Sequence, residues 1–171
     1  MSLQELADKQ AIYEQMCRYC QAIDRTDLEL LKSTFHEDAR ADMGVVDAPA
    51  MEFADQIIPY LEETLVMATH RITNVWIEVR GNRAFAESYM LGYAWDADQK
   101  GGPKDIPDGM RYADIWEKRE AGSWKILHRK LIMDWNACWE HSGVFVEGMY
   151  AEFTRGRRGK SDPGYEFGTT G

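Results

Sequence analysis

The sequence predicts one α+β domain in which helices come first and an antiparallel sheet follows. Apolar residues recur at helical spacing through residues 3–24 and again through 51–68. From His70 onward the period changes to two, and four such stretches alternate with short turn-forming segments. Helices that cover one face of a four-stranded meander make an α+β domain.

The composition limits the classes of partner. A chain of 171 residues is long enough for one domain with a buried core. Its formal net charge of −9 argues against binding to nucleic acids or anionic membranes, and the basic cluster at 155–160 is typical of a solvated tail. No apolar run reaches the ~18 residues of a membrane helix, and the first residues lack the pattern of a signal peptide. Three cysteines, an odd number, suit a reducing compartment, so we expect a cytoplasmic protein.

The first predicted helix spans residues 3–24 and carries a Cys-x-x-Cys spacing in its interior. Redox pairs of this form lie at a helix N-terminus, so Cys17 and Cys20 are expected to be buried free thiols. Asp27 has the position of an N-cap for a short helix over 28–35, and a weak strand follows at 39–43. Pro59 is expected to kink or break the helix over 51–68. The apolar side of the first helix is predicted to comprise Leu6, Tyr13, Met16, Cys17, Cys20 and Ile23.

The predicted strands cover residues 70–80, 83–95, 110–119 and 124–135, with Gly81-Asn82 as the first hairpin turn. The second strand has small side chains on one face, which allows another layer to pack closely. The stretch 96–109, rich in glycine, proline, aspartate and lysine, is predicted to be a mobile loop. After residue 136 the pattern fades, so we expect a domain over 1–136 and an extension over 137–171 that is partly disordered or in an oligomer interface.

Three ionisable residues are the candidates for a shared polar site: two interrupt apolar patterns, and the third stands at a change from helix to strand. Asp24 turns toward the covered side at the end of the first helix, and Arg129 lies within an apolar face of the last strand. His70 stands where the second long helix gives way to the first strand, and an imidazole beside a carboxylate suits proton abstraction. Each has an ordinary alternative: an exposed helix end for Asp24, a snorkelling side chain for Arg129, and a capping or surface position for His70. The sequence holds no glycine-rich nucleotide loop, His-Glu-x-x-His or serine-nucleophile pattern, so we expect neither a cofactor nor a metal.

Several short motifs, in this order, resemble the SnoaL-like branch of the nuclear transport factor 2-like superfamily over roughly residues 5–136. They are the helix end 19–27 with Tyr19 and Asp24, the segment 35–39, the segment 69–74 with His70, and the closing stretch 124–129. The resemblance implies a cone-shaped α+β barrel, with N-terminal helices packed on a curved, mixed sheet that encloses an apolar pocket. The branch includes scytalone dehydratase, bile-acid 7α-dehydratase, hexachlorocyclohexane dehydrochlorinase and polyketide cyclases.

The resemblance also implies site residues and an activity. In dehydratase-like members a helix-end Asp and a strand-start His form a dyad, which Asp24 and His70 match. The same comparison gives catalytic roles to Tyr19 and Arg129 and a pocket position near Tyr93. We expect the substrate-binding wall to consist of Tyr93, Tyr89, Trp116 and Met133. The implied activity is that of a cofactor-independent lyase (dehydratase) or isomerase in a homo-dimer or homo-trimer, with a small hydrophobic cyclic substrate (aromatic, steroid-like or polyketide). The alternatives are a non-catalytic small-molecule-binding protein and a structural subunit resembling the β chain of a ring-hydroxylating dioxygenase.

Overall fold

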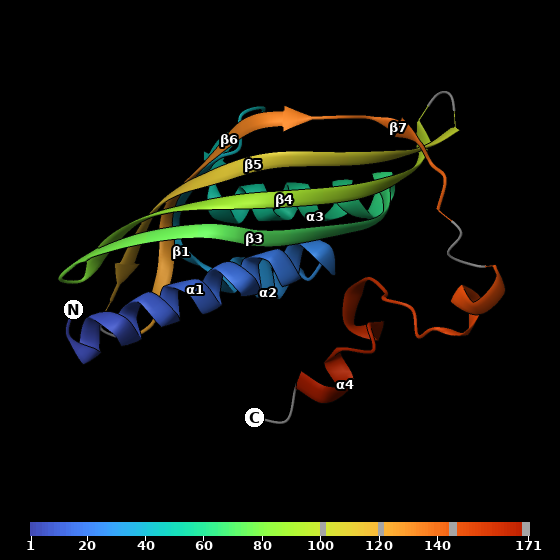
Figure 1. Cartoon of the computed structure of the whole chain (residues 1–171). Coiled ribbons are helices and arrows are strands. Elements are labelled where there is room, and N and C mark those ends of the chain that lie inside the picture. The colour runs from blue at the N-terminus through green and yellow to red at the C-terminus, as the bar shows by residue number, and fades with distance from the viewer. Residues whose placement is uncertain (100–101, 120–121, 144–146, 169–171) are drawn as a thin grey trace.

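The computed structural model describes residues 1–99, 102–119, 122–143 and 147–168, and it has the predicted α+β architecture (Figure 1). The helices are α1 (Leu3–Asp24), α2 (Leu28–Ser33) and α3 (Ala50–Thr64). The strands are β1 (Phe35–Asp42), β2 (Asp47–Pro49), β3 (Leu65–Arg80), β4 (Arg83–Gln99), β5 (Gly102–Lys118), β6 (Trp124–Asn136) and β7 (Trp139–Glu140). The C-terminal part adds two short 3-10 helices, Gly148–Glu152 and Gly159–Ser161, and the single-turn α4 (Tyr165–Gly168).

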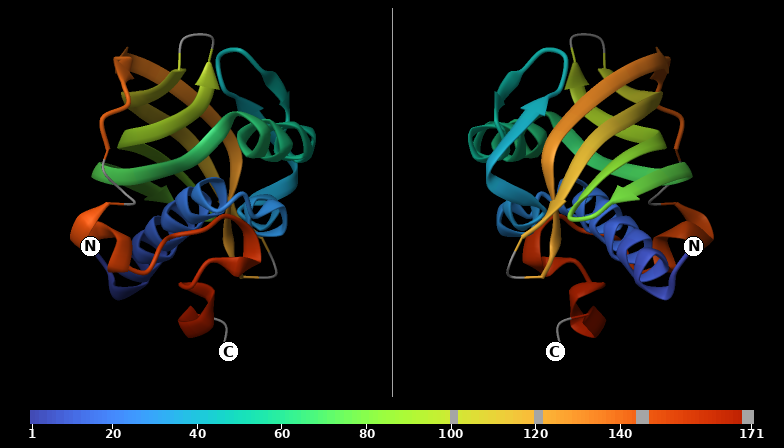
Figure 2. Two further views of the ribbon diagram at one scale, coloured as in Figure 1. Left: turned by 90° about the vertical axis from the view of Figure 1, so that its right-hand side faces the viewer. Right: turned by 90° about the vertical axis from the view of Figure 1, so that its left-hand side faces the viewer.

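All seven strands belong to one mixed sheet. Its order is β2-β1-β6-β5-β4-β3, and β7 pairs with β5. The four long strands β3 to β6 form the predicted antiparallel meander, whereas β1 runs parallel to β6 and antiparallel to β2. The sheet curls over α1 and α3 without closing (Figure 2). This arrangement is the cone expected from the resemblance.

The buried face of α1 is rotated from the predicted one. Leu6 is 50% exposed and Tyr13 38%, and the Cys17 thiol is exposed rather than buried. The residues that α1 does bury are Asp8, Ile12, Met16, Tyr19, Cys20, Ala22 and Ile23. Asp8 explains the difference, because it accepts a hydrogen bond from the Trp124 indole (2.8 Å) and so occupies the buried side. A prediction of the buried face from apolar residues alone does not include a buried polar residue such as Asp8.

The change from helix to strand after α3 comes earlier than predicted. The helix continues through Pro59 and ends at Thr64, and β3 begins at Leu65 instead of His70. Residues 65–72 of β3 pair with β4, so this stretch obtains its hydrogen bonds across the sheet. His70 therefore lies inside β3, with its backbone held by pairing on the β4 side.

The stretch 96–109, predicted to be a loop, forms the ends of β4 and β5 in the described residues. Pro103 and Pro107 are tolerated there because β6 ends opposite residue 108, beyond which only the short β7 pairs with this part of β5. The two tips are tied together by Asp105, which accepts a hydrogen bond from the Tyr93 hydroxyl (2.6 Å). Cross-strand contacts of this kind outweigh the poor strand propensity of the segment.

The C-terminal extension first adds β7 to the sheet, and its later part, with Lys160, Asp162 and Tyr165, then lies against the N-terminal helices. Asp27 accepts a hydrogen bond from the Leu30 N–H (3.2 Å), as the predicted N-cap of α2. The same carboxylate pairs with Lys160 and accepts a hydrogen bond from the Tyr165 hydroxyl (2.6 Å). An ion pair between Arg25 and Asp162 (3.2 Å) adds a second anchor.

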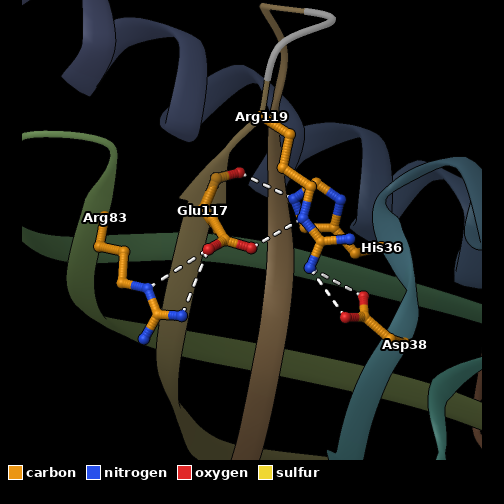
Figure 3. Close-up of polar contacts among 5 residues, drawn as sticks. All are labelled: His36, Asp38, Arg83, Glu117 and Arg119. Carbon is orange, nitrogen blue, oxygen red and sulfur yellow. Dashed lines mark hydrogen bonds and ion pairs between the residues drawn. The ribbon is translucent and has the colours of Figure 1, made fainter.

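A network of charged side chains joins β1, β4 and β5 (Figure 3). Glu117 pairs with Arg119 (2.8 Å) and with Arg83 (3.3 Å), and its carbonyl oxygen lies 2.9 Å from the His36 ring. Arg119 continues to Asp38 (2.9 Å). The hydrogen bond from Arg119 lowers the pKa of the Glu117 carboxyl below its ordinary value, against the effect of burial. The network stabilises the sheet and lies outside the cavity described below.

No described helix is long and apolar enough to cross a membrane. Among the described side chains, no group of three or more His, Cys, Asp or Glu residues is arranged to hold a metal ion.

Candidate active site

A cavity of about 260 Å³ lies between α1, α3 and the sheet. Its lining is mainly apolar and includes Ile23, Phe53, Ile57, Leu61, Leu65, Met110 and Leu131. Five ionisable side chains also line it: Tyr19, His70, Tyr93, Asp108 and Tyr112. A mostly apolar hollow with a few convergent polar groups is typical of a small-molecule site.

His70 lines this cavity, and Asp24, which is not part of the described lining, forms a close pair with it. One carboxylate oxygen of Asp24 accepts a hydrogen bond from the backbone N–H of His70 (3.0 Å), and the other lies 2.5 Å from the imidazole Nδ1. The two side chains are 23% and 15% exposed, so the pair is largely shielded. Because α1 packs along β3, the end of the helix is brought to the sixth residue of the strand. Asp24 occupies Nδ1, which leaves Nε2 as the ring nitrogen that can meet a ligand in the cavity.

A second carboxylate, Asp108, faces the cavity and was not among the predicted site residues. His70, Gly92 and Asp108 are directly paired across β3, β4 and β5, so they lie in one row across the sheet. A Cβ atom on Gly92 would overlap the Asp108 carboxyl, which shows that this side chain leans over the glycine. Burial raises the pKa of Asp108 above its ordinary value, and the charge of a protonated His70 acts against this.

Arg129 does not reach the cavity, although the sequence placed it in the same polar site as Asp24 and His70. It is fully buried and forms two hydrogen bonds with Asp114, at 2.8 and 2.7 Å. Its guanidinium lies between the rings of Tyr19 (4.0 Å) and Tyr112 (4.1 Å). The two tyrosines line the cavity, so Arg129 supports its wall from behind.

A β-bulge changes which residues of β6 face inward. The pairing of β5 with β6 shifts between Ile115 and Trp116, where Leu127 is the extra residue. Before the bulge Ile126 is buried, and after it Arg129 is. The simple alternation used in the sequence prediction does not hold across this point.

Tyr19 lines the cavity and is only 1% exposed. Burial raises the pKa of its phenol, while the Arg129 guanidinium acts in the opposite direction. The phenol therefore keeps its proton at neutral pH and can donate a hydrogen bond. Its ring packs edge-on against Phe35 and Tyr112, at 5.9 and 5.6 Å between centroids.

The four predicted substrate-binding residues are scattered. Tyr93 contributes to the lining, but its hydroxyl is bonded to Asp105. Tyr89 is 42% exposed on the other face of the sheet, with the Arg111 guanidinium 5.8 Å from its ring. Trp116 is completely buried in the core, and Met133 is 51% exposed; neither belongs to the described lining of the cavity. On β4 the small residues Ala84, Ala86 and Ser88 are the buried ones, so Tyr89 lies on the opposite, exposed face of the sheet.

The chain shares a sequence pattern and a fold with known proteins. Residues 4–130 match the family described as the SnoaL-like domain. No curated protein sequence matches the chain. Among solved structures, a candidate scytalone dehydratase from Novosphingobium aromaticivorans superposes with a TM-score of 0.72 at 20% identity, over 83% of this chain and 94% of that one.

Two further structures show the same fold. The hexachlorocyclohexane dehydrochlorinase LinA-type3 from Novosphingobium barchaimii has a TM-score of 0.69 at 19% identity, covering 80% of this chain and 93% of that one. A nuclear transport factor 2-like superfamily protein from Salmonella enterica has a TM-score of 0.68 at 23% identity, covering 82% and 96%. Since the family pattern spans most of the chain, the protein belongs to the SnoaL-like domain family.

Proposed function

We propose that this protein is a cofactor-independent lyase or isomerase that removes a proton from a small hydrophobic cyclic substrate. The observation that carries the proposal is the Asp24–His70 pair, 2.5 Å between carboxylate and imidazole, at the wall of an apolar cavity. A histidine held by a carboxylate is a general base with a defined tautomer and orientation. Neighbours described as a dehydratase and a dehydrochlorinase share the fold, which agrees with elimination chemistry.

In the proposed mechanism His70 Nε2 takes the proton from carbon. Asp24 holds the Nδ1–H, orients the ring and stabilises the imidazolium that forms. Tyr19 keeps its proton and donates a hydrogen bond to the oxygen on which negative charge develops. Arg129 is a positioning residue in this scheme, since it acts through the rings of Tyr19 and Tyr112 rather than on the substrate.

The cavity favours a compact substrate. Its volume of about 260 Å³ lies just below the ~300–1,000 Å³ of common ligand pockets. A single ring or two fused rings suits this space better than a four-ring steroid. The aliphatic and aromatic lining would bind such a ring chiefly by burying apolar surface.

The test is turnover of a defined panel: scytalone, hexachlorocyclohexane and 3-hydroxycyclohexanone. We expect His70→Ala to lower kcat on a turned-over substrate by about 10²–10⁴-fold. The melting temperature should stay close to that of the wild type, because the imidazole is at the cavity wall and not in the core. The matched control is His128→Ala, which alters an exposed histidine of β6 and should leave the rate unchanged.

Ligand binding without turnover, equally strong in wild type and His70→Ala, would instead support a non-catalytic binding protein. A stable hetero-complex that survives loss of both Asp24 and His70 would support a structural subunit like a dioxygenase β chain. A cytoplasmic location and self-association as a dimer or trimer remain part of the proposal. The exposed Trp76, Tyr89 and Leu91 on the sheet favour self-association.

A further inference from the structure

The Asp108 carboxyl has a buried oxygen with no hydrogen-bond partner within the described residues. This atom is Oδ1, and the cavity lined by Asp108 is the same one that His70 lines. Buried polar atoms in folded proteins are nearly always paired, and the exceptions call for an explanation. A bound substrate group that occupies the cavity and meets this oxygen is such an explanation.

The geometry places Asp108 opposite the base. Neighbouring strands lie ~4.8 Å apart, so the Cα atoms of His70 and Asp108, two strands apart, are about 10 Å from each other. Gly92 stands between them in the row and has no side chain. The Asp108 carboxyl therefore occupies the space above Gly92, on the side of the row toward His70, and a substrate in the cavity can meet the imidazole and the carboxyl together.

The surroundings favour the protonated form of Asp108. The groups that α3 turns toward the cavity are the apolar Phe53, Ile57 and Leu61, and β6 contributes Leu131. The other titratable side chains in the lining are Tyr19 on α1, His70 on β3, Tyr93 on β4 and Tyr112 on β5. A charged His70 and a hydrogen bond from the Gly92 backbone act against protonation, and the first of these is absent when the base is uncharged and ready to react. An uncharged imidazole beside an uncharged carboxyl is the arrangement that an apolar cavity favours.

We propose that Asp108 donates a proton to the leaving group and that the substrate is a β-hydroxy carbonyl compound. Its hydroxyl lies on the carbon next to the one whose C–H bond the carbonyl activates. This inference rests on the proposed role of His70. His70 Nε2 takes the proton from the carbon next to the carbonyl, and the C–H electron pair forms the new C=C bond. The C–O bond breaks, its electron pair stays on oxygen, and the oxygen leaves as water with the Asp108 proton. Proton transfer from imidazolium to carboxylate through water then restores both groups.

The chemical reason for naming a hydroxyl is the difference between leaving groups. Hydroxide is too basic to leave unaided, so its departure requires an acid. Chloride departs as an anion and gains little from a proton donor. Among the eliminations of related folds, an acid in the cavity opposite the base therefore indicates dehydration and not loss of halide.

The first experiment needs no substrate. Infrared difference spectra at pH 7 compare the wild type with Asp108→Asn, and Asp134→Asn serves as control because Asp134 is an ion-paired carboxylate on the other face of the sheet. We expect a carbonyl band of a protonated carboxyl in the wild type and in Asp134→Asn, and its loss in Asp108→Asn. The absence of that band in the wild type would overturn the proposal.

The second experiment compares two leaving groups that give the same product, cyclohex-2-enone, from 3-hydroxycyclohexanone and 3-chlorocyclohexanone. We expect Asp108→Asn to slow enzyme-dependent dehydration by about 10²–10⁴-fold and chloride elimination by less than about tenfold. An equal loss with both substrates would overturn the role of Asp108 as proton donor while leaving the base intact. Loss of both rates in His70→Ala would support the proposed function. The lack of any turnover by the wild type would count against that function, even if the infrared band of a protonated carboxyl is present.

Discussion

The buried ion pair between Arg129 and Asp114 gives the sharpest test of how the cavity wall is held. Both side chains are almost fully excluded from solvent, at 1% and 0% exposure, and two hydrogen bonds join them. Burial alone lowers the pKa of the guanidinium, but the charge and hydrogen bonds of Asp114 raise it above its ordinary value. Arg129 therefore stays charged in the core, and the free energy of unfolding depends on the presence of Asp114 as its partner.

Replacing one partner, in Asp114→Leu or Arg129→Met, leaves the other as an uncompensated buried charge. Such a loss costs about 3–5 kcal/mol of unfolding free energy. For a domain of this size each kcal/mol lowers the melting temperature by about 2–4 °C, so the expected shift is about 6–20 °C. The double variant removes both charges and should cost much less than the sum of the two single variants.

The assay is urea unfolding followed by tryptophan fluorescence, with thermal melting as a second measurement. A matched control exists on the same two strands: Arg111 and Asp134 form a solvent-screened pair at 2.9 Å on the other face of the sheet. Arg111→Met should cost far less than Arg129→Met, since water screens exposed pairs. Single variants within about 1 kcal/mol of the wild type, or costs that add in the double variant, would refute the reasoning.

Two further predictions concern the surface networks. Because the folded-state pKa of Glu117 lies below its ordinary value of 4.5, its contribution to stability is present above that pH and is lost as pH falls through the lowered pKa. Glu117→Gln should therefore reduce stability at pH 7 and flatten the acid loss in pH-dependent melting; an unchanged acid limb would contradict this. Asp27→Ala should cost about 0.5–2 kcal/mol in urea unfolding through the lost N-cap and should speed trypsin cleavage after Arg155 and Arg157. Asp27→Asn keeps the cap acceptor, so it should speed cleavage with little loss of stability; equal protection from trypsin would show that Lys160 does not anchor the tail.

Local patterns in the sequence were sufficient for the order of the three main helices and the four long strands, but not for the short β2 and β7. Helical spacing predicts α1 to the residue at which it ends, and Asp27 caps α2 as its type and position indicate. The turn at Gly81 follows from the need for a left-handed backbone, which the structure shows at φ 64°. Asp24 could be singled out because it interrupts an apolar pattern, and His70 because it stands where helical spacing gives way to strand spacing; the structure brings the two together.

Only the tertiary structure decided what completes the cavity. Asp108 was assigned to a loop because Gly, Pro and Asp are poor strand formers, whereas pairing with β4 makes it part of the sheet opposite His70. The sequence prediction placed Arg129 in the site because its actual partner, Asp114, lies on another strand and could not be recognised from neighbouring residues. Neither the register of strands nor a bulge is encoded within a few neighbouring residues, since both depend on contacts between distant parts of the chain. The sequence by itself determined the elements and the dyad, and the packing of one element on another decided which side chains face the ligand.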